Sequence, residues 1–449
     1  MDISKSLIDE VVQISNSRLA ETEKAKVKSC LLDYVGVSVA GEKMLRENVK
    51  AFNSEFNAGT FKLIHSESLT DLMSSSFLHG MISHAAELDD GHRSGMFHPG
   101  APIFSALLPI LQTRSFDIDQ FYKAVICGYQ ISIKLARIMQ PDLKKRGFHA
   151  TGVAGTIGAG ISAGMLLNFD KAKLHNTLSA CCTAASGILK VIKDGSDMKP
   201  LNVAYAAQNG VTAALSAQAG FTGADDVLGS KLGFIDTFIS ENNSSPELIN
   251  DTDFQIHDIY LKPHAACRHC HGPIDGTINL INKFKIDPGD IDRIDVDTYS
   301  LAIYGHDHQD IKGVNSAKMS IPYSVAVAAT HGKADIELFD SPFIEDRSIT
   351  SVIHKVFVQE DDRYTQMVPE KRPARVKIKM RNGEILSEEI LLPKGEPESP
   401  ITEEELADKV VSLLAYGNIN QDLANQLINV IRNSNDSTTD TFIEFIYKL

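Results

Sequence analysis

Residues 150–169 read ATGVAGTIGAGISAGMLLNF and contain no charged side chain. Five of these residues are glycines, so the stretch gains little free energy in lipid but allows other helices to pack closely against it. We therefore expect a helix buried in a helical bundle and no transmembrane segment. The glycines of GTIGAG at 155–160 also suit a dinucleotide-binding loop, but no strand signal precedes them, so we expect no Rossmann site.

Helical periodicity extends outward on both sides of this stretch. Leu7, Val11 and Ile14 recur at helical spacing, and residues 100–235 are apolar on most sides, as in buried helices. Near the end, Thr402 and Glu405 form a capping box before another amphipathic run. These patterns predict a large helical domain made from both chain ends, residues 1–257 and 396–449.

The pattern changes between these two segments. IDVDTY at 294–299 and VKIKM at 376–380 alternate apolar and polar residues, and Asn382-Gly383 is a two-residue hairpin turn signal. We therefore expect a smaller α+β domain over 258–395, and a fold class that is mainly α.

Composition excludes several classes of protein. The 449 residues carry 44 Lys and Arg against 58 Asp and Glu, and a net charge of −14 disfavours a nucleic acid or an anionic membrane as partner. Six cysteines in a chain of this length do not form a disulfide framework. The first ten residues, MDISKSLIDE, lack an apolar signal-peptide core, so we expect a cytoplasmic location.

The segment 79–99, HGMISHAAELDDGHRSGMFHP, concentrates four histidines with three acidic residues. Asp89 or Asp90 could orient a base, while His98, in a loop stiffened by Pro99, faces a ligand. The alternative is a capped helix end with solvated histidines.

Two further positions lie at expected helix starts. His149 precedes the glycine-rich helix, where backbone N–H groups bind anions and a histidine can exchange protons. Lys199 begins another apolar helix, where its charge opposes the helix dipole, so binding a carboxylate would explain it. A surface loop histidine and a solvated lysine are the alternatives.

The segment Cys267-Arg-His-Cys-His271 contains CxxCH, which matches a c-type haem attachment site and also suggests zinc. Haem attachment requires export, and no second CxxC or HxxxH pair completes a tetrahedral site. We therefore expect no metal and no cofactor. A metal- or haem-binding protein using Cys267, Cys270 and His271 is kept as a hypothesis from another class.

Taken in order, these clusters resemble the MmgE/PrpD family, which includes 2-methylcitrate dehydratases, cis-aconitate decarboxylases and iminodisuccinate epimerases. The matching motifs cover nearly the whole chain: HAAELDD (84–90) with His98-Pro99, RGFHATG (146–152), GSDMK (195–199) with AAQNG (206–210), GFTGA (220–224), Lys262-Pro263 with CRHCHGPID (267–275), SIPY (320–323) and GEP (395–397).

The resemblance implies that the α+β domain is a lid on the helical domain, that the protein is a homodimer, and that a cofactor-free pocket lies between the domains. It also implies the site residues. The expected catalytic residues are Asp90, His98, His149 and His271, and the expected substrate-binding residues are Asp89, Lys199, Lys262, Arg268 and Tyr323. Two departures bear on substrate choice: Gly91 stands where the family often has Thr, and His264 where it often has Tyr.

The reactions of this family share one chemical problem, because negative charge develops on a carbon beside a carboxylate. Lys199 and Lys262 would stabilise that charge, and His98 and His149 would act as acid and base. The leading hypothesis is a lyase acting on a citrate-like di- or tricarboxylate, similar to 2-methylcitrate dehydratase. Decarboxylase and epimerase activities are alternatives within the family, and a catalytically silent dimeric scaffold is a third class.

Overall fold

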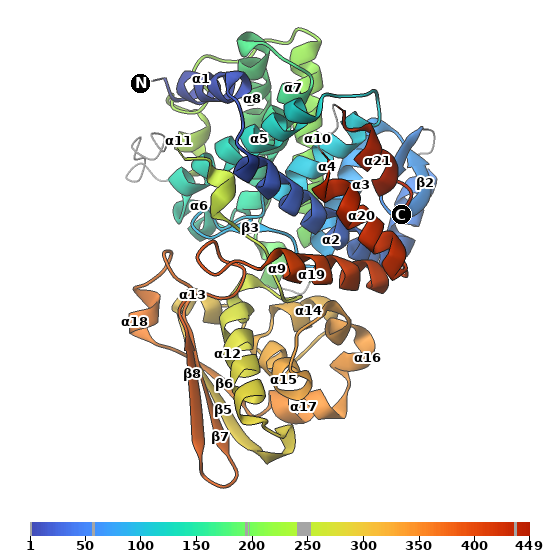
Figure 1. Ribbon diagram of the computed structural model, residues 1–449. Coiled ribbons are helices and arrows are strands. Elements are labelled where there is room, and N and C mark those ends of the chain that lie inside the picture. Colours follow the sequence, from blue (N-terminus) through green and yellow to red (C-terminus); the bar gives the residue numbers. More distant parts are fainter. Residues whose placement is uncertain (1, 56–58, 194–195, 197, 240–252, 435–437) are drawn as a thin grey trace. The chain divides into compact units, whose positions relative to one another are not determined.

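The structure is a computed structural model that describes residues 2–55, 59–193, 196, 198–239, 253–434 and 438–449. Contacts divide the chain into two compact units (Figure 1). Unit 1 comprises Met1–Val191, Met198–Ile259 and Glu403–Leu449, and unit 2 comprises Ile192–Asp197 and Tyr260–Thr402. The chain is mainly helical, as expected from the sequence.

Unit 1 is a helical bundle with one small hairpin. Its helices are α1 (Ile3–Asn16), α2 (Glu21–Glu55), α3 (Leu72–Ala85), α4 (Gly100–Leu111), α5 (Ile118–Met139), α6 (Asp142–Lys145), α7 (Ala150–Leu166), α8 (Lys171–Ala184), α10 (Lys199–Gln218), α11 (Phe234–Phe238), α19 (Glu403–Tyr416), α20 (Gln421–Arg432), α21 (Asp440–Ile446) and the 3₁₀ turn η2 (Gln255–Asp258). Its strands are β1 (Phe61–Leu63) and β2 (Ser66–Thr70), which pair antiparallel, and β3 (Gly91–His92). The short α9 (Lys190–Lys193) and β4 (Ile259–Tyr260) span the unit borders.

The glycine-rich segment is α7, and each of its 17 residues is buried. It packs against α4, α5, α8 and α10, so the expected buried helix is confirmed. Among the described residues, no helix combines the length and apolarity that crossing a bilayer requires.

Helices α7 and α10 run parallel and in register. A Cβ built on Gly155 in α7 would lie 3.8 Å from Ala206 Cβ in α10, and further along both helices a Cβ built on Gly210 in α10 would lie 2.6 Å from Ala159 Cβ and 2.7 Å from Gly160 N in α7. Gly160 and Gly210 each lie eleven positions after His149 and Lys199, the residues at the starts of α7 and α10. The two helix starts therefore lie beside each other in unit 1.

The C-terminal end of α3 also lies near the starts of α7 and α10. A Cβ on Gly80 in α3 would lie 2.5 Å from Ala204 Cα, so the two helices cross with their backbones in contact. Ala204 is in the second turn of α10, and Gly80 is one turn before His84. Close packing at these small residues thus brings three chemically interesting segments together.

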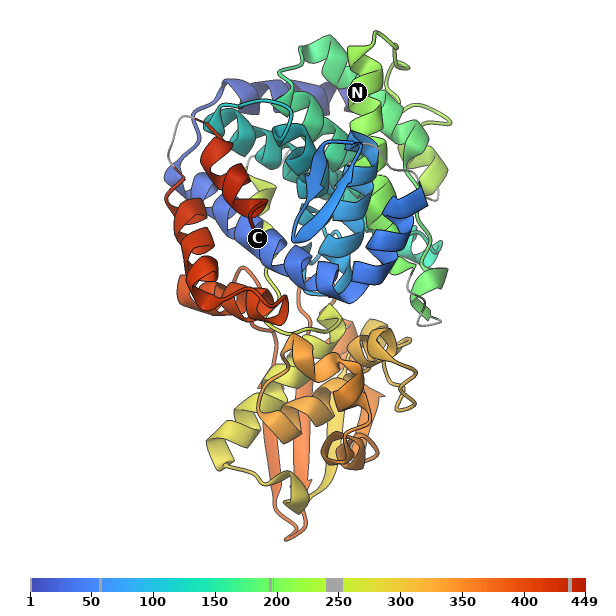
Figure 2. The ribbon, with the colours of Figure 1, turned by 90° about the vertical axis from the view of Figure 1, so that its right-hand side faces the viewer.

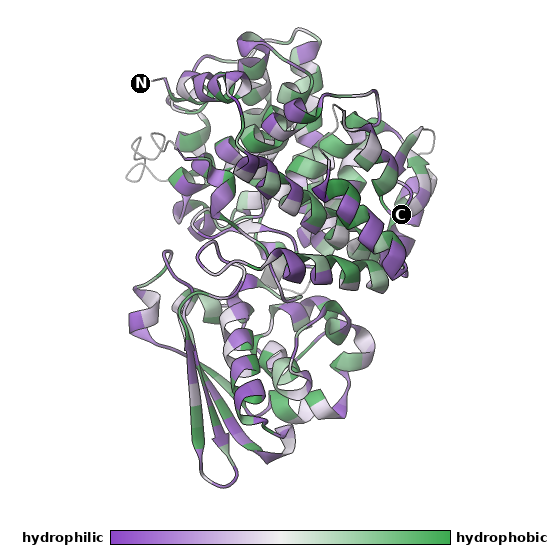
Figure 3. Cartoon of the chain, in the orientation of Figure 1, coloured by the Kyte–Doolittle hydropathy of each residue, from purple (hydrophilic) through white to green (hydrophobic). Residues whose placement is uncertain are grey.

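The chain's last helices complete unit 1. α19 begins at Glu403, directly after the expected cap Thr402, and packs with α20 along α2. α20 buries Ala424, Leu427, Ile428 and Ile431 on one side, and Figure 3 shows hydrophilic colour on its other side. This apolar stripe explains why the C-terminal segment joins the N-terminal helices.

Unit 2 contains a four-stranded sheet in the order β6-β5-β7-β8, with helices on one face (Figure 2). The strands are β5 (Ile291–Thr298), β6 (Val356–Glu360), β7 (Ala374–Met380) and β8 (Ile385–Ile390); β6 is parallel to β5, whereas β7 is antiparallel to β5 and β8. The helical elements are α12 (Arg268–Phe284), η3 (Pro288–Asp290), α13 (Ser300–Ile303), α14 (Val314–Met319), α15 (Ile321–His331), η4 (Ile336–Phe339), α16 (Ser341–Ile344), α17 (Arg347–Ile353) and α18 (Asp362–Thr365).

The expected alternating strands lie in β5 and β7, and the expected hairpin joins β7 to β8. Its loop is longer than the two-residue turn that was predicted. Met380 N donates to Glu384 O at 2.8 Å, and this hydrogen bond closes a loop of three residues. Gly383 takes the third loop position at φ +90°, where a side chain would be strained. Asn-Gly therefore marked the hairpin correctly but not its loop length.

The contact between α7 and α10 predicts an unusual result for Gly210→Ala. Alanine favours a helix over glycine by about 0.8–1.0 kcal/mol, but here its methyl group overlaps α7, and overpacking costs about 1–3 kcal/mol. We expect a net loss of stability in urea unfolding. The control is Gly36→Ala in α2, where the nearest atom would be 3.4 Å from the new Cβ, and which should be neutral or stabilising. Equal effects of the two substitutions would contradict this account.

Candidate functional site

Unit 1 brings together six ionisable side chains, here called the His84 cluster: His84, Glu87, Asp89, His98, His149 and Lys199. They come from the end of α3, the loop after it, and the starts of α7 and α10. Glu87 adopts φ +57°, which turns the chain back after α3. Of these side chains only His98 and Lys199 have appreciable exposure, 13% and 12%.

His84 lies at the centre of the cluster. Its Nδ1 is 2.7 Å from Asp89 Oδ2, so Nδ1–H donates to a buried carboxylate. The ring centroid is 5.0 Å from that of His98 and 6.0 Å from that of His149. Its Nε2 is 3.8 Å from Glu87 Oε1 and has no hydrogen bond within the described residues. His84 was not among the site residues expected from the sequence, where its spacing of five from Asp89 was the available signal.

The tautomer of His98 follows from a backbone contact. Nδ1 is 2.6 Å from the carbonyl oxygen of Asp90, which can only accept, so Nδ1 carries the proton. In the neutral ring Nε2 is then the basic nitrogen. The His98 backbone N–H also donates to Thr151 Oγ1 at 3.2 Å, which ties this loop to α7.

His149 has the opposite tautomer. Asn202 Nδ2 lies 3.3 Å from Ile188 O, which orients the amide, and 3.1 Å from His149 Nδ1. His149 Nδ1 therefore accepts, and Nε2 carries the proton of the neutral ring. Burial, with the positive charge of Lys199, holds the pKa of His149 well below its ordinary value. His149 is thus a neutral donor at neutral pH, and its titration should not shape a pH profile there.

Lys199 forms an ion pair with Glu87, and both side chains are largely buried. The expected carboxylate contact of Lys199 is thus made by a residue of the same unit. Glu87, which was not among the expected site residues, fixes where the ammonium group lies.

Asp89 and Asp90 have different surroundings. Asp89 contacts His84, and its Oδ2 is 3.5 Å from His98 Nδ1. The carboxylate of Asp90 accepts from Gly100 N at 3.0 Å and from Tyr129 OH at 2.6 Å. Burial, helped by the charges of Asp33 and Asp89, raises the pKa of Asp90 to about 7.

Unit 2 holds the other expected site residues. Arg268 donates to Glu396 Oε1 at 2.8 Å, to Lys394 O at 3.0 Å and to His271 Nδ1 at 3.0 Å. His271 is fully buried and its Nε2 donates to Ala266 O at 3.1 Å, so both ring nitrogens have protein partners. Burial, together with Arg268, holds the pKa of His271 well below its ordinary value.

Lys262 and Tyr323 are also fully buried in unit 2. Tyr323 OH donates to Leu338 O at 2.7 Å, and burial raises its pKa. His264, at one of the unusual positions, contacts Asp275 Oδ1 through Nε2 at 2.8 Å. Gly195 and Asp197 of the expected GSDMK motif lie outside the described residues.

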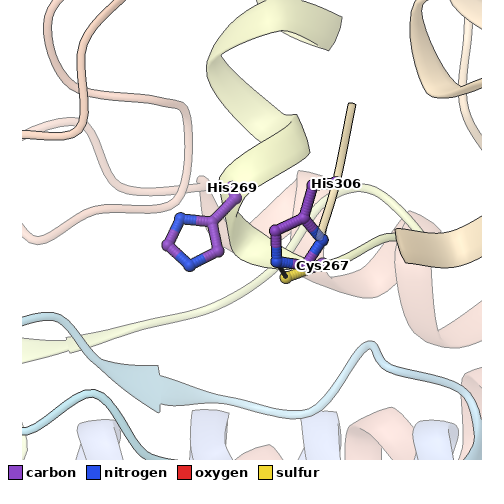
Figure 4. Close-up of side chains that lie close together, drawn as sticks. All are labelled: Cys267, His269 and His306. Carbon is purple, nitrogen blue, oxygen red and sulfur yellow. Dashed lines mark hydrogen bonds between the residues drawn. The ribbon is translucent and has the colours of Figure 1, made fainter. Parts of the chain in front are cut away.

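Two groups of described residues have donor atoms within 4.8 Å of one another, close enough to suit a metal ion. The first, His84, Asp89 and His98, is part of the His84 cluster. The second, Cys267, His269 and His306, lies in unit 2 (Figure 4). Neither is the set Cys267, Cys270 and His271 of the alternative metal- or haem-binding hypothesis.

Comparison with known proteins gives consistent matches. Residues 5–247 match the MmgE/PrpD N-terminal domain, and residues 264–435 match the MmgE/PrpD C-terminal domain. The cis-aconitate decarboxylase-like protein oryM of Aspergillus oryzae is 24% identical, over 91% of this chain and 89% of that protein. The cis-aconitate decarboxylase of Aspergillus terreus is 23% identical over 73% of this chain and 72% of its own length. That of Mus musculus is 22% identical over 74% and 70%.

The two domain matches together span most of the sequence, and they occur in the order in which the family arranges them. This chain belongs to the MmgE/PrpD family.

Proposed function

We propose that the protein is a cofactor-independent lyase that acts on a citrate-like di- or tricarboxylate, with its acid/base chemistry in the His84 cluster. The observation that carries this proposal is the pair of opposite tautomers. His98 presents a basic Nε2 and His149 a protonated Nε2, and both rings flank His84. A site of this kind can take a proton at one nitrogen and supply one at another.

The charge of Lys199 supports the same chemistry. Dehydration and decarboxylation both leave an electron pair on a carbon atom. That carbon lies next to a carboxylate or next to a group that is conjugated with a carboxylate. A buried ammonium group stabilises such a charge more strongly than one in water. Glu87 holds Lys199 in place, and a substrate carboxylate would share this ammonium group or displace Glu87 from it.

The reaction we favour is decarboxylation of a cis-aconitate-like acid. The relatives described above carry that activity, or likeness to it, in their names. At 22–24% identity the fold is better preserved than the reaction, so dehydration of a 2-methylcitrate-like acid and epimerisation remain within the proposal. We also propose a homodimer, without a nucleic acid or membrane partner.

The contacts support different roles for the expected residues. We propose His98 and His149 as catalytic residues, with His84 and Asp89 beside them, and Lys199 as substrate-binding. Lys262 is also proposed to bind substrate, whereas Arg268, whose guanidinium donates to Glu396, Lys394 and His271, is proposed as a positioning residue. Asp90, His271 and Tyr323 are proposed as positioning residues, because each uses its side-chain polar atoms on protein partners.

Proton NMR of the purified chain with cis-aconitate, 2-methylcitrate and iminodisuccinate tests the proposal. Loss of carbon dioxide from cis-aconitate is expected, and water loss or epimerisation would be seen in the same spectra. Lys199→Gln, purified identically, shows whether turnover belongs to this chain, since losing a buried charged contact costs about 2–5 kcal/mol. A folded protein that leaves all three acids unchanged would overturn the proposal.

His98→Gln should lower turnover by about 10²–10⁴, because general acid/base catalysis contributes that much to the chemical step. Glutamine keeps a side-chain amide that can donate to Asp90 O, so substrate affinity should change only several-fold. The matched control is His257→Gln in the same unit, whose side chain is 42% exposed and lies outside the cluster. Wild-type turnover in His98→Gln would remove His98 from the chemistry.

Asp90→Asn tests the positioning role through stability. Burial raises the pKa of Asp90 from its ordinary value of 3.8 to about 7, so the protonated carboxyl stabilises the fold below about pH 4, and this contribution is lost as the pH rises through 7. Relative to Asp90→Asn, the wild-type free energy of unfolding should therefore fall between pH 4 and 7, by on the order of 4 kcal/mol. Urea unfolding of both proteins at several pH values measures this, and a constant difference would contradict it.

A further inference from the structure

Three donor side chains meet in unit 2 at the beginning of α12. Cys267 is the N-cap residue of α12, His269 is in its first turn, and His306 comes from the loop between α13 and α14. Figure 4 shows the two imidazole rings near the Cys267 sulfur, and the His306 Nε2 to Cys267 Sγ distance is 4.0 Å. The three donor atoms all lie within 4.8 Å of one another.

His306 is already oriented as a metal ligand. Its Nδ1 is 2.7 Å from the carbonyl oxygen of Met319, so Nδ1 carries the proton and Nε2 has the lone pair. Metal-binding histidines commonly use one ring nitrogen in this way, donating to a carbonyl while the other nitrogen binds the ion. Here the nitrogen with the lone pair is the one near Cys267.

His269 can adopt the same tautomer as His306, with the proton on Nδ1. Its Nδ1 is 2.7 Å from Tyr299 OH, a hydroxyl that can accept a hydrogen bond as well as donate one. When Nδ1–H donates to Tyr299, Nε2 becomes the nitrogen that can bind an ion. The Arg372 guanidinium lies 3.5 Å from the same hydroxyl and 3.4 Å from His269 Nδ1, so this tautomer requires Arg372 to donate to Tyr299 and not to His269.

We propose that Cys267, His269 and His306 bind a divalent metal ion of the zinc type. A thiolate and two imidazoles are ligands that zinc favours, at about 2.3 Å for sulfur and 2.0–2.1 Å for nitrogen. A tetrahedral ion with these bonds separates sulfur and nitrogen by about 3.6 Å, against the 4.0 Å observed between Cys267 and His306. For the ion to bind, the Cys267–His306 distance has to shorten slightly, and the two distances to His269, which are at most 4.8 Å, have to reach similar values.

Three protein ligands leave one tetrahedral position for water or another small ligand. The ion would tie the start of α12 to the loop that carries His306, two segments that are 39 residues apart. The proposed lyase chemistry uses no ligand of this site, so metal binding can be tested without measuring turnover.

This site shares only Cys267 with the CxxCH hypothesis, and Cys270 is the ligand that distinguishes the two in a test. Cys270 is fully buried in α12 and is not one of the three grouped donors. No metal was expected from the sequence because no second CxxC or HxxxH pair accompanies CxxCH, and His306 lies in an HDH stretch that matches neither motif.

Titration of the chelator-treated full chain with Co²⁺ tests the proposal. We expect one equivalent to produce a thiolate-to-cobalt band in the near ultraviolet together with tetrahedral d–d bands, and zinc to displace them. Cys267→Ser should abolish the near-ultraviolet band, and His306→Gln should weaken cobalt binding at least about tenfold. Cys270→Ala is the matched control and should keep the full spectrum, with circular dichroism confirming that each variant is folded.

Absence of a saturable band in the wild-type chain would overturn the proposal. So would a near-ultraviolet band that survives in folded Cys267→Ser. Loss of the band in folded Cys270→Ala would instead assign the metal to the CxxCH segment and reject the site described here. Elemental analysis for zinc in the protein as purified gives an independent stoichiometry.

Discussion

Close backbone packing at glycine is the constraint on which the candidate site depends. The contact of Gly210 with Ala159 and Gly160 holds α7 and α10 parallel and in register, and Gly80 brings α3 onto α10. As a result the ends of three helices meet, and with them His84, His149 and Lys199. Larger side chains at these crossings would separate the helices and the charged groups together.

Much of the fold was predictable because it follows local patterns. The glycine-rich run predicted α7, and alternation predicted β5 and β7. The hairpin loop was less predictable, since Asn382-Gly383 suits turns of more than one length and the strand pairing decides which forms. The sequence of 79–99 likewise predicted a polar cluster, but composition does not tell which side chains face inward.

Prediction of the site residues from the sequence was limited in the same way. Asp89 and Asp90 are adjacent, yet Asp89 contacts His84 while Asp90 binds Tyr129, which is 39 positions away. His84 and Glu87 were overlooked because their partners follow from the geometry of the loop after α3. Cys267 and His306 meet only through tertiary packing, whereas CxxCH, visible in the sequence, suggested a different set of ligands.

The parallel arrangement of α7 and α10 has an electrostatic consequence. Each helix start carries roughly half a positive charge from its unpaired N–H groups, and two such starts lie together beside a lysine. Together with the Lys199 ammonium group, the two helix starts offset the negative charges of Glu87 and Asp89, which are buried and therefore poorly solvated by water. If the proposed substrate displaces Glu87 from Lys199, as suggested above, the two helix starts would be left facing its carboxylate, so a ligand that brings negative charge would restore the balance that Glu87 provides in the unliganded unit.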